Sequence, residues 1–185
     1  MAGVGPPVRD RRGLRILIGT VAVGVLAALA LLSFGRHAPA VAPDFTSQDM
    51  HGQAVGLSAL RGRVVLINLW ATWCPPCREE MPSMQRMYDR LKGPDFELLA
   101  VSEDEGGKDL VEPFVRDMKL TFPVLLDPEH EVGDRYGVWG YPETFVLDRS
   151  GRVVERVIGP RDWDAPAERA KLQALISSGQ ASAAD

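Results

Sequence analysis

The strongest constraint on the fold of this chain is a change of hydrophobic pattern around its only two cysteines, Cys74 and Cys77. Just before them, Val64–Trp70 is a short, nearly continuous apolar run rich in β-branched residues, which is typical of a strand buried on both faces of a sheet. From Pro75 to Leu91 the apolar residues recur at helical spacing, and proline suits the first turn of a helix. The sequence therefore predicts that the cysteines lie where a buried strand passes into a helix.

The remainder of the chain alternates strand-like and helix-like segments. Further strands are predicted over Phe96–Ser102, Phe122–Leu126, Thr144–Asp148 and Arg152–Ile158, and helices over Lys108–Leu120, Glu129–Tyr136 and Trp163–Ser178. The order combines parallel crossovers with one closing hairpin, so we predict an α/β fold in which helices cover both faces of a central mixed β-sheet.

A basic cluster and a long apolar run occupy the first 35 residues. Arginines precede an uncharged stretch from Ile16 to Gly35, whose 20 residues as a helix would span about 30 Å, the thickness of a bilayer's hydrocarbon core. We therefore expect a cytoplasmic N-terminus at residues 1–15, a transmembrane anchor at 16–35, a linker at 36–43 and an exported domain at 44–180. A cleaved signal peptide is the alternative, because Ala38-Pro39-Ala40 has the small-x-small form of a cleavage site.

The charge of the exported domain is acidic. Five of the 21 basic residues and one of the 25 acidic residues precede position 41, which leaves 16 basic and 24 acidic residues and a net charge of −8. An acidic domain repels phosphate backbones, so we expect no nucleic acid among its partners.

The position of the cysteines favours redox chemistry. The free N–H groups and partial positive charge of a helix N-terminus favour a thiolate at Cys74, which makes it the expected nucleophile. Cys77 lies one turn further along and could attack the mixed disulfide that Cys74 forms. Pro75 and Pro76 lack N–H donors, so we expect the thiolate to be only moderately stabilised and the couple to be reducing.

Three other interpretations of the cysteine pair stay open from the residues alone. A structural disulfide across so short a loop would give little loop-closure entropy. Half of a zinc site would lack ligands, because zinc usually has four and the histidines are scattered at His37, His51 and His130. The third interpretation is two inert buried thiols.

Two stretches resemble the membrane-anchored TlpA/ResA/CcmG group of thiol–disulfide oxidoreductases in the thioredoxin superfamily. They are Leu57–Pro82, which contains Trp73-Cys74-Pro75-Pro76-Cys77, and Gly137–Phe145, which is similar to the CcmG branch. The resemblance implies a thioredoxin-like fold with an N-terminal hairpin and an inserted helix and strand over Lys108–Leu126. It also implies a redox-active disulfide without any further cofactor or metal.

The resemblance assigns roles around the cysteines. Pro142 is expected to be the cis-proline of the fold, so that Tyr141 and Pro142 lie beside the Cys74 sulfur; an ordinary trans proline is the alternative. Asn68 replaces the buried aspartate of ordinary thioredoxins, and Glu80 is expected to take over as the proton acceptor with a raised pKa. An ordinary surface glutamate is the other interpretation of Glu80.

Four further residues are expected on the substrate side of the site. Trp73 is expected to form part of the rim on which a partner rests, and Pro75 and Pro76 shape the loop. Glu143, which follows the expected cis-proline, would add negative charge nearby.

The function that these features predict is a membrane-tethered reductant of protein disulfides outside the cytoplasm. The resemblance points to the cysteine pair of apocytochrome c as substrate and to a membrane electron donor of the DsbD or CcdA type. A single-pass location in the inner membrane, with a periplasmic catalytic domain, follows from the anchor. A peroxiredoxin-like thiol peroxidase, with Thr72 near Cys74, and a non-catalytic tethered binding module are the alternatives.

Overall fold

The computed structural model describes residues 40–178, which form part of one compact unit. The expected basic N-terminus, anchor and first part of the linker lie outside the described residues, as do residues 179–180 of the expected domain. Within 40–178, every helix is too short or too polar to cross a bilayer.

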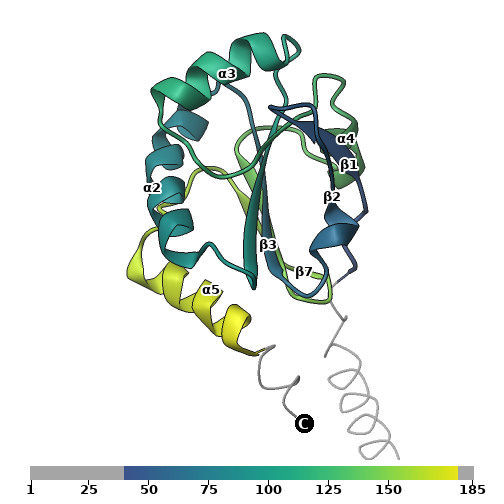
Figure 1. Cartoon of the computed structure of the whole chain (residues 1–185). Helices are drawn as coiled ribbons and strands as arrows, with labels where there is room; N and C mark the ends of the chain where they lie inside the picture. Colours follow the sequence, from purple (N-terminus) through teal and green to yellow (C-terminus); the bar gives the residue numbers. More distant parts are fainter. Residues whose placement is uncertain (1–39, 179–185) are drawn as a thin grey trace, which may run out of the picture. The chain divides into compact units, whose positions relative to one another are not determined.

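A mixed β-sheet runs through the centre of the described part of the chain (Figure 1). Its seven strands lie in the order β2-β1-β5-β4-β3-β6-β7. The three central strands β5, β4 and β3 are parallel, and the other pairings are antiparallel. The strand bounds are β1 Thr46–Asp49, β2 Ala54–Gly56, β3 Val64–Trp70, β4 Phe96–Ser102, β5 Val124–Leu126, β6 Glu143–Leu147 and β7 Val153–Ile158.

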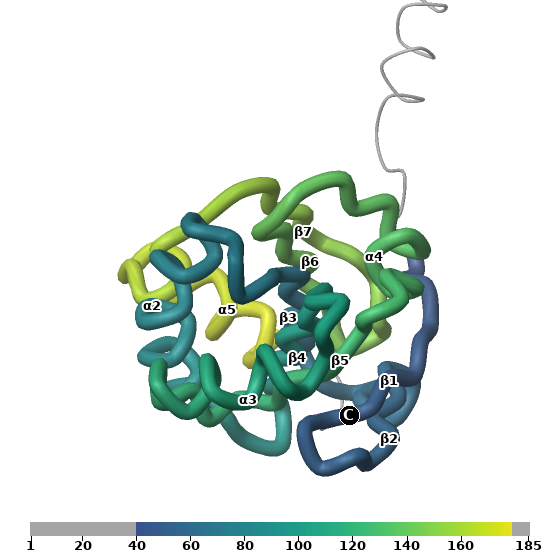
Figure 2. Tube along the Cα trace, turned by 90° about the horizontal axis from the view of Figure 1, so that it is seen from above, coloured from purple at the N-terminus to yellow at the C-terminus, as the bar shows by residue number. Residues whose placement is uncertain are grey.

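Helices cover both faces of this sheet, as Figure 2 shows from above. The bounds are η1 Leu57–Leu60, α2 Pro75–Leu91, α3 Lys108–Asp117, α4 Glu131–Tyr136 and α5 Pro166–Ser178. The helices α2, α3 and α5 share one apolar core with the sheet, and α4 shares the other core with η1. The predicted α/β architecture, N-terminal hairpin and inserted helix and strand are therefore confirmed, and the fold is thioredoxin-like.

Strand β3 separates the two cores, because its side chains alternate between the faces of the sheet. Val64, Leu66 and Trp70 belong to the core under α2, whereas the odd-numbered residues from Val65 to Leu69 belong to the core under α4. Asn68 falls on the even-numbered face, so its amide is buried beneath α2. A polar side chain is thereby placed directly below the helix that carries the second cysteine.

Several predicted boundaries were wrong: α4, β6 and β7 differ from their predicted bounds by one or two residues, and three other differences have a clear local reason. Helix α3 ends at Asp117 instead of Leu120, because Lys119 takes a left-handed conformation with φ of 54°. Strand β5 begins at Val124 instead of Phe122, after Pro123, which has no N–H for the ladder. Helix α5 begins at Pro166 instead of Trp163, with proline in the favoured first position.

The domain begins before the end of the expected linker. The N–H of Ala42 donates to the carbonyl of Gly151 (2.9 Å), and the N–H of Val153 donates to the carbonyl of Ala40 (2.9 Å). Gly151, with φ of 75°, forms the turn between β6 and β7, where such a conformation favours glycine. Residues 40–42 therefore belong to the folded domain.

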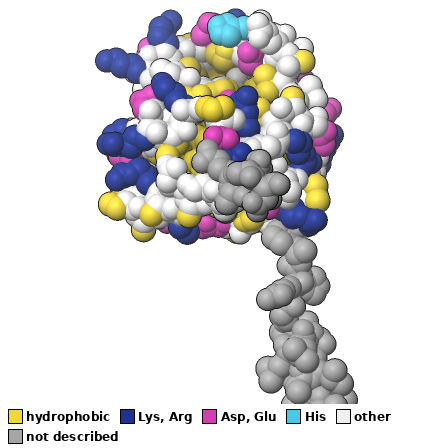
Figure 3. Space-filling model, turned by 60° about the horizontal axis from the view of Figure 1, so that its bottom comes forward, with side chains coloured by type: hydrophobic (Ala, Val, Ile, Leu, Met, Phe, Trp, Pro, Cys, Tyr) yellow, Lys and Arg dark blue, Asp and Glu magenta, His cyan; other side chains and the backbone are white. Residues whose placement is uncertain are grey.

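The surface at the lower end of the domain is of mixed type. In Figure 3, Lys and Arg side chains alternate with Asp and Glu side chains and with apolar ones among the described residues. This face lies opposite the end of the sheet where β3 passes into α2 (Figure 1).

Candidate active site

The two cysteines form a disulfide at the N-terminus of α2. Cys74 is the N-cap residue, and the N–H of Cys77 donates to its Sγ at 3.2 Å. Cys74 is 3% exposed and Cys77 is fully buried, so Cys74 is the sulfur nearer to solvent. Neither Pro75 nor Pro76 has an N–H, so Cys77 supplies the first backbone donor of the helix, and it points at the Cys74 sulfur.

An aromatic and proline wall adjoins the disulfide. The Tyr141–Pro142 peptide bond is cis, as expected. The ladder pairs Leu69 with Glu143, so this bond lies at the end of β3 from which the cysteine loop departs. Trp73 is 65% exposed, and its ring lies 5.8 Å from that of Tyr141 in an edge-on arrangement. The two rings thus form a rim beside Cys74.

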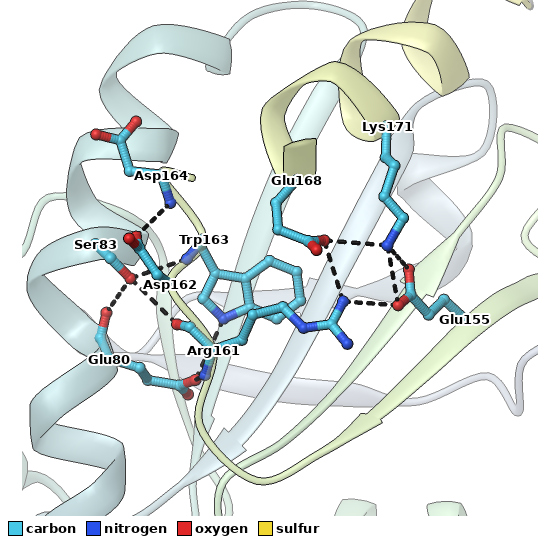
Figure 4. Close-up of polar contacts among 9 residues, drawn as sticks. All are labelled: Glu80, Ser83, Glu155, Arg161, Asp162, Trp163, Asp164, Glu168 and Lys171. Carbon is cyan, nitrogen blue, oxygen red and sulfur yellow. Dashed lines mark hydrogen bonds and ion pairs between the residues drawn. The ribbon is translucent and has the colours of Figure 1, made fainter. Parts of the chain in front are cut away.

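Glu80 is a buried carboxylate on α2, with only 3% of its surface exposed (Figure 4). Its Oε2 accepts hydrogen bonds from the backbone N–H of Arg161 (3.1 Å) and from Trp163 Nε1 (3.2 Å). Asn68 Nδ2 donates to its Oε1 at 2.9 Å. Burial raises the pKa of Glu80 to about 7, although the three hydrogen bonds act in the opposite direction.

Asn68 links Glu80 to strand β6. Its Nδ2 also donates to Thr144 Oγ1 (2.9 Å), whereas its Oδ1 is buried without a hydrogen-bond partner. A half-turn of the amide would present Oδ1 to the Glu80 carboxyl, which can donate once it is protonated. In the arrangement observed, Nδ2 donates to both Glu80 and Thr144, which suits the ionised carboxylate of Glu80.

Ser83 fixes the segment that covers Glu80. Its hydroxyl donates to the carbonyl of Glu80 (2.8 Å) and accepts from the N–H of Trp163 (3.0 Å). A pocket of about 320 Å³ opens beside this contact and is lined by Glu80, Ser83 and Arg161, among others. Glu79, in contrast, is exposed.

The loop before Cys74 is held by Asp104, a residue that the sequence interpretation missed. Asp104 is 1% exposed, and its carboxylate accepts from the N–H (2.9 Å) and the hydroxyl (2.6 Å) of Thr72. Ser102 Oγ donates to the same carboxylate at 2.8 Å. The threonine hydroxyl is thus committed to Asp104.

Glu103 and His130 were missed as well. Glu103 Oε2 lies 2.9 Å from His130 Nδ1 and accepts from the Tyr141 hydroxyl at 3.5 Å. Burial, together with the charge of Asp127, raises the pKa of Glu103 to about 8. This cluster holds the ring of Tyr141 from behind, so it positions the rim next to the disulfide.

Glu143 has a different environment from the one expected. Its carboxylate is 3% exposed and pairs with the guanidinium of Arg156 on β7. The negative charge expected near the site is therefore balanced, and Glu143 remains beside Pro142 as part of a pocket wall.

The zinc interpretation has no support within residues 40–178, where no group of three or more His, Cys, Asp and Glu side chains is arranged to hold a metal ion. His51 and His130 are both described, and neither lies with the cysteines in such a group.

The comparisons with known proteins agree with this geometry. The sequence profile of the AhpC/TSA family matches residues 39–156. This chain belongs to that family. It is 40% identical over 119 residues to the thiol–disulfide oxidoreductase ResA of Bacillus thuringiensis, an alignment that covers 64% of this chain and 68% of ResA. The chain is thus a thiol–disulfide oxidoreductase of the ResA type, which confirms the predicted group and enzyme class.

Solved structures give the same result. A Chlorobium tepidum protein assigned as the thiol:disulfide interchange protein DsbE aligns with a TM-score of 0.65 at 33% identity, over 76% of this chain and 96% of that one. StoA from Bacillus subtilis aligns with a TM-score of 0.60 at 28% identity, over 74% of this chain and 98% of that one.

Proposed function

We propose that this enzyme is a membrane-tethered reductant of protein disulfides outside the cytoplasm. The observation that carries the direction is the single backbone donor at the Cys74 sulfur. A strong oxidant of this type stabilises its reduced form, which requires a well-solvated thiolate. Because the two prolines lack N–H groups, the first turn of the helix offers few donors to the Cys74 thiolate. The reduced form is therefore stabilised little, and the couple is reducing.

The proposed reaction is a two-step thiol–disulfide exchange. In the reduced enzyme, the Cys74 thiolate attacks one sulfur of the substrate disulfide, forming a mixed disulfide and releasing the other substrate sulfur as a thiolate. Cys77 then attacks Cys74 Sγ, which releases the second substrate sulfur and forms the Cys74–Cys77 disulfide. The substrate gains two electrons, and the enzyme dithiol loses them.

Glu80 is the proposed acceptor of the Cys77 proton. It follows Cys77 by three residues on α2, so both side chains leave the same face of the helix, and both are buried. A buried thiol needs a nearby base, because no water solvates its thiolate. A pKa of about 7 lets Glu80 take up a proton and release it again near neutral pH.

The proposed substrate is the cysteine pair of apocytochrome c, and the proposed electron donor is a membrane protein of the DsbD or CcdA type. Both proposals rest on the resemblance to the TlpA/ResA/CcmG group. The tether and the inner-membrane location rest on the arginines and the apolar run at Ile16–Gly35.

Trapping the mixed disulfide tests the proposed substrate. A Cys77→Ala variant lacks the resolving sulfur, so it is expected to hold its substrate covalently through Cys74. Mass spectrometry of complexes that dithiothreitol releases would identify the substrate, and a Cys74→Ala variant serves as the matched control. Equal recovery from both variants would contradict the assignment of Cys74 as the attacking sulfur.

Deleting the gene tests the specific assignment. Loss of covalently bound haem c, with restoration by the wild type and not by Cys74→Ala, would support it. If the amount of covalently bound haem c is unchanged, apocytochrome c is excluded as the required substrate. The proposal of a general reductant of protein disulfides would then remain.

A further inference from the structure

The three most exposed large hydrophobic side chains of residues 40–178 lie around the cis-proline. Trp139 is 97% exposed, Ile158 is 78% exposed and Trp73 is 65% exposed. Trp139 and Ile158 line one pocket of about 280 Å³ together with Tyr141 and Pro142. A fully exposed tryptophan leaves a large apolar area in water, and tryptophan is enriched among residues that dominate binding energy.

Through Tyr141, this pocket adjoins the place where a substrate cysteine must bind. Tyr141 forms one wall of the pocket, and its ring contacts Trp73, which directly precedes Cys74. A polypeptide whose cysteine reaches Cys74 would therefore pass the Trp73–Tyr141 rim and extend over the pocket.

The charges of the pocket indicate which side chain fits it. Its charged lining residues are Glu143 and Arg156, and these two pair with each other. The Arg156 guanidinium also stacks over Phe145 at 5.1 Å and donates to the carbonyl of Gly137 at 2.8 Å. The two charges in the pocket lining thus balance each other, and the other lining side chains are mostly apolar, which suits an uncharged apolar side chain.

We propose that the Trp139–Ile158 pocket binds an apolar side chain, aromatic by preference, on the substrate segment that flanks the reacting cysteine. This inference rests on the proposed function, in that it takes the substrate to be a polypeptide. It assigns Trp139 and Ile158 as specificity-determining residues of the disulfide exchange.

A pair of peptides tests the inference. Both carry one intramolecular disulfide, and they differ only in having Phe or Ser beside the first cysteine. The reduced full-length enzyme is expected to reduce the Phe peptide roughly tenfold faster, as judged by kcat/KM, because truncating one buried aromatic anchor costs about that much affinity. Trp139→Ala is expected to abolish the preference, and Ile158→Ser is expected to reduce it.

Leu110→Ala provides the matched control, because Leu110 is a half-exposed apolar residue on α3, outside the pocket. It is expected to keep the full preference. Equal rates of the two peptides with the wild type, or a full preference in Trp139→Ala, would overturn the inference.

The same peptides separate this inference from the proposed direction. The experiment is repeated with oxidised enzyme and the two dithiol peptides. If exchange proceeds only in that direction, the reductant proposal is wrong, and the ratio of the two peptides still decides the role of the pocket. If no peptide reacts in either direction, both proposals fail.

Discussion

Replacing Glu80 with glutamine is expected to remove a large part of the dependence of stability on pH. Burial raises the pKa of Glu80 from its ordinary value of 4.5 to about 7 in the folded protein. Between these values, the folded protein keeps a proton on Glu80 that the unfolded chain releases. The free energy of unfolding that Glu80 contributes is therefore fully present below about pH 4.5 and is lost as the pH rises through about 7.

The size of this effect follows from the two pKa values. They differ by about 2.5, and each pKa unit corresponds to about 1.36 kcal/mol, so the loss is roughly 3 kcal/mol. The stability difference between wild type and Glu80→Gln is expected to fall by that amount between about pH 4.5 and pH 8. Using the difference cancels the contribution of Glu103, which is the same in both proteins.

Urea denaturation of the oxidised proteins, followed by circular dichroism at several pH values, measures this difference. Glu79→Gln is the matched control, because Glu79 is the exposed neighbour of Glu80 on the same helix. The difference in unfolding free energy between Glu79→Gln and the wild type is expected to be independent of pH. A flat difference for Glu80→Gln as well would refute the conclusion that burial controls this carboxyl.

Three further expectations concern other parts of the site. Asp104→Ala is expected to lower the free energy of unfolding by about 1–3 kcal/mol in urea denaturation, because it leaves the N–H and hydroxyl of Thr72 without their acceptor. Arg156→Ala is expected to lower it by about 1–3 kcal/mol, because Glu143 would be left buried without its cation; thermal denaturation measures this loss. Purified enzyme is expected to consume hydrogen peroxide no faster than Cys74→Ser, because the Thr72 hydroxyl is held by Asp104.

Each of these expectations would be contradicted by a specific result. Arg116→Ala removes an ion pair in which both side chains are 73% exposed, so it is the control for Arg156→Ala and is expected to change stability by less than about 0.5 kcal/mol. Equal effects of the two substitutions would mean that the Glu143 carboxyl needs no partner. If Asp104→Ala is as stable as the wild type, Asp104 does not anchor the loop before Cys74. Peroxide turnover that depends on Cys74 would favour the interpretation as a thiol peroxidase.

Much of the fold could be predicted because the signals are local. The β-branched run before Cys74 and the helical spacing after Pro75 define β3 and α2 at their observed bounds. The predicted boundaries failed where a single backbone conformation or a missing donor decides the end of an element, as at Lys119 and Pro123. Backbone effects at single residues leave little trace in the hydrophobic pattern of a sequence.

The site was predictable only in part, for a similar reason. Glu80 could be found because it shares a helix face with Cys77, three residues away. Its partners Arg161 and Trp163 come from a segment about 80 residues later, and no local pattern connects them to α2. Glu103 had an available signal, since acidic residues directly follow β4 at the sheet edge where β3 ends in the cysteine loop.

The reduction potential of the Cys74–Cys77 couple tests the central proposal most directly. Equilibrating the enzyme with glutathione or thioredoxin redox buffers and counting free thiols gives this value. A potential of about −250 mV or below is expected for a reductant whose Cys74 thiolate has one backbone donor. A potential near −120 mV, as in strong oxidants, would contradict the proposal and reverse the direction of the reaction.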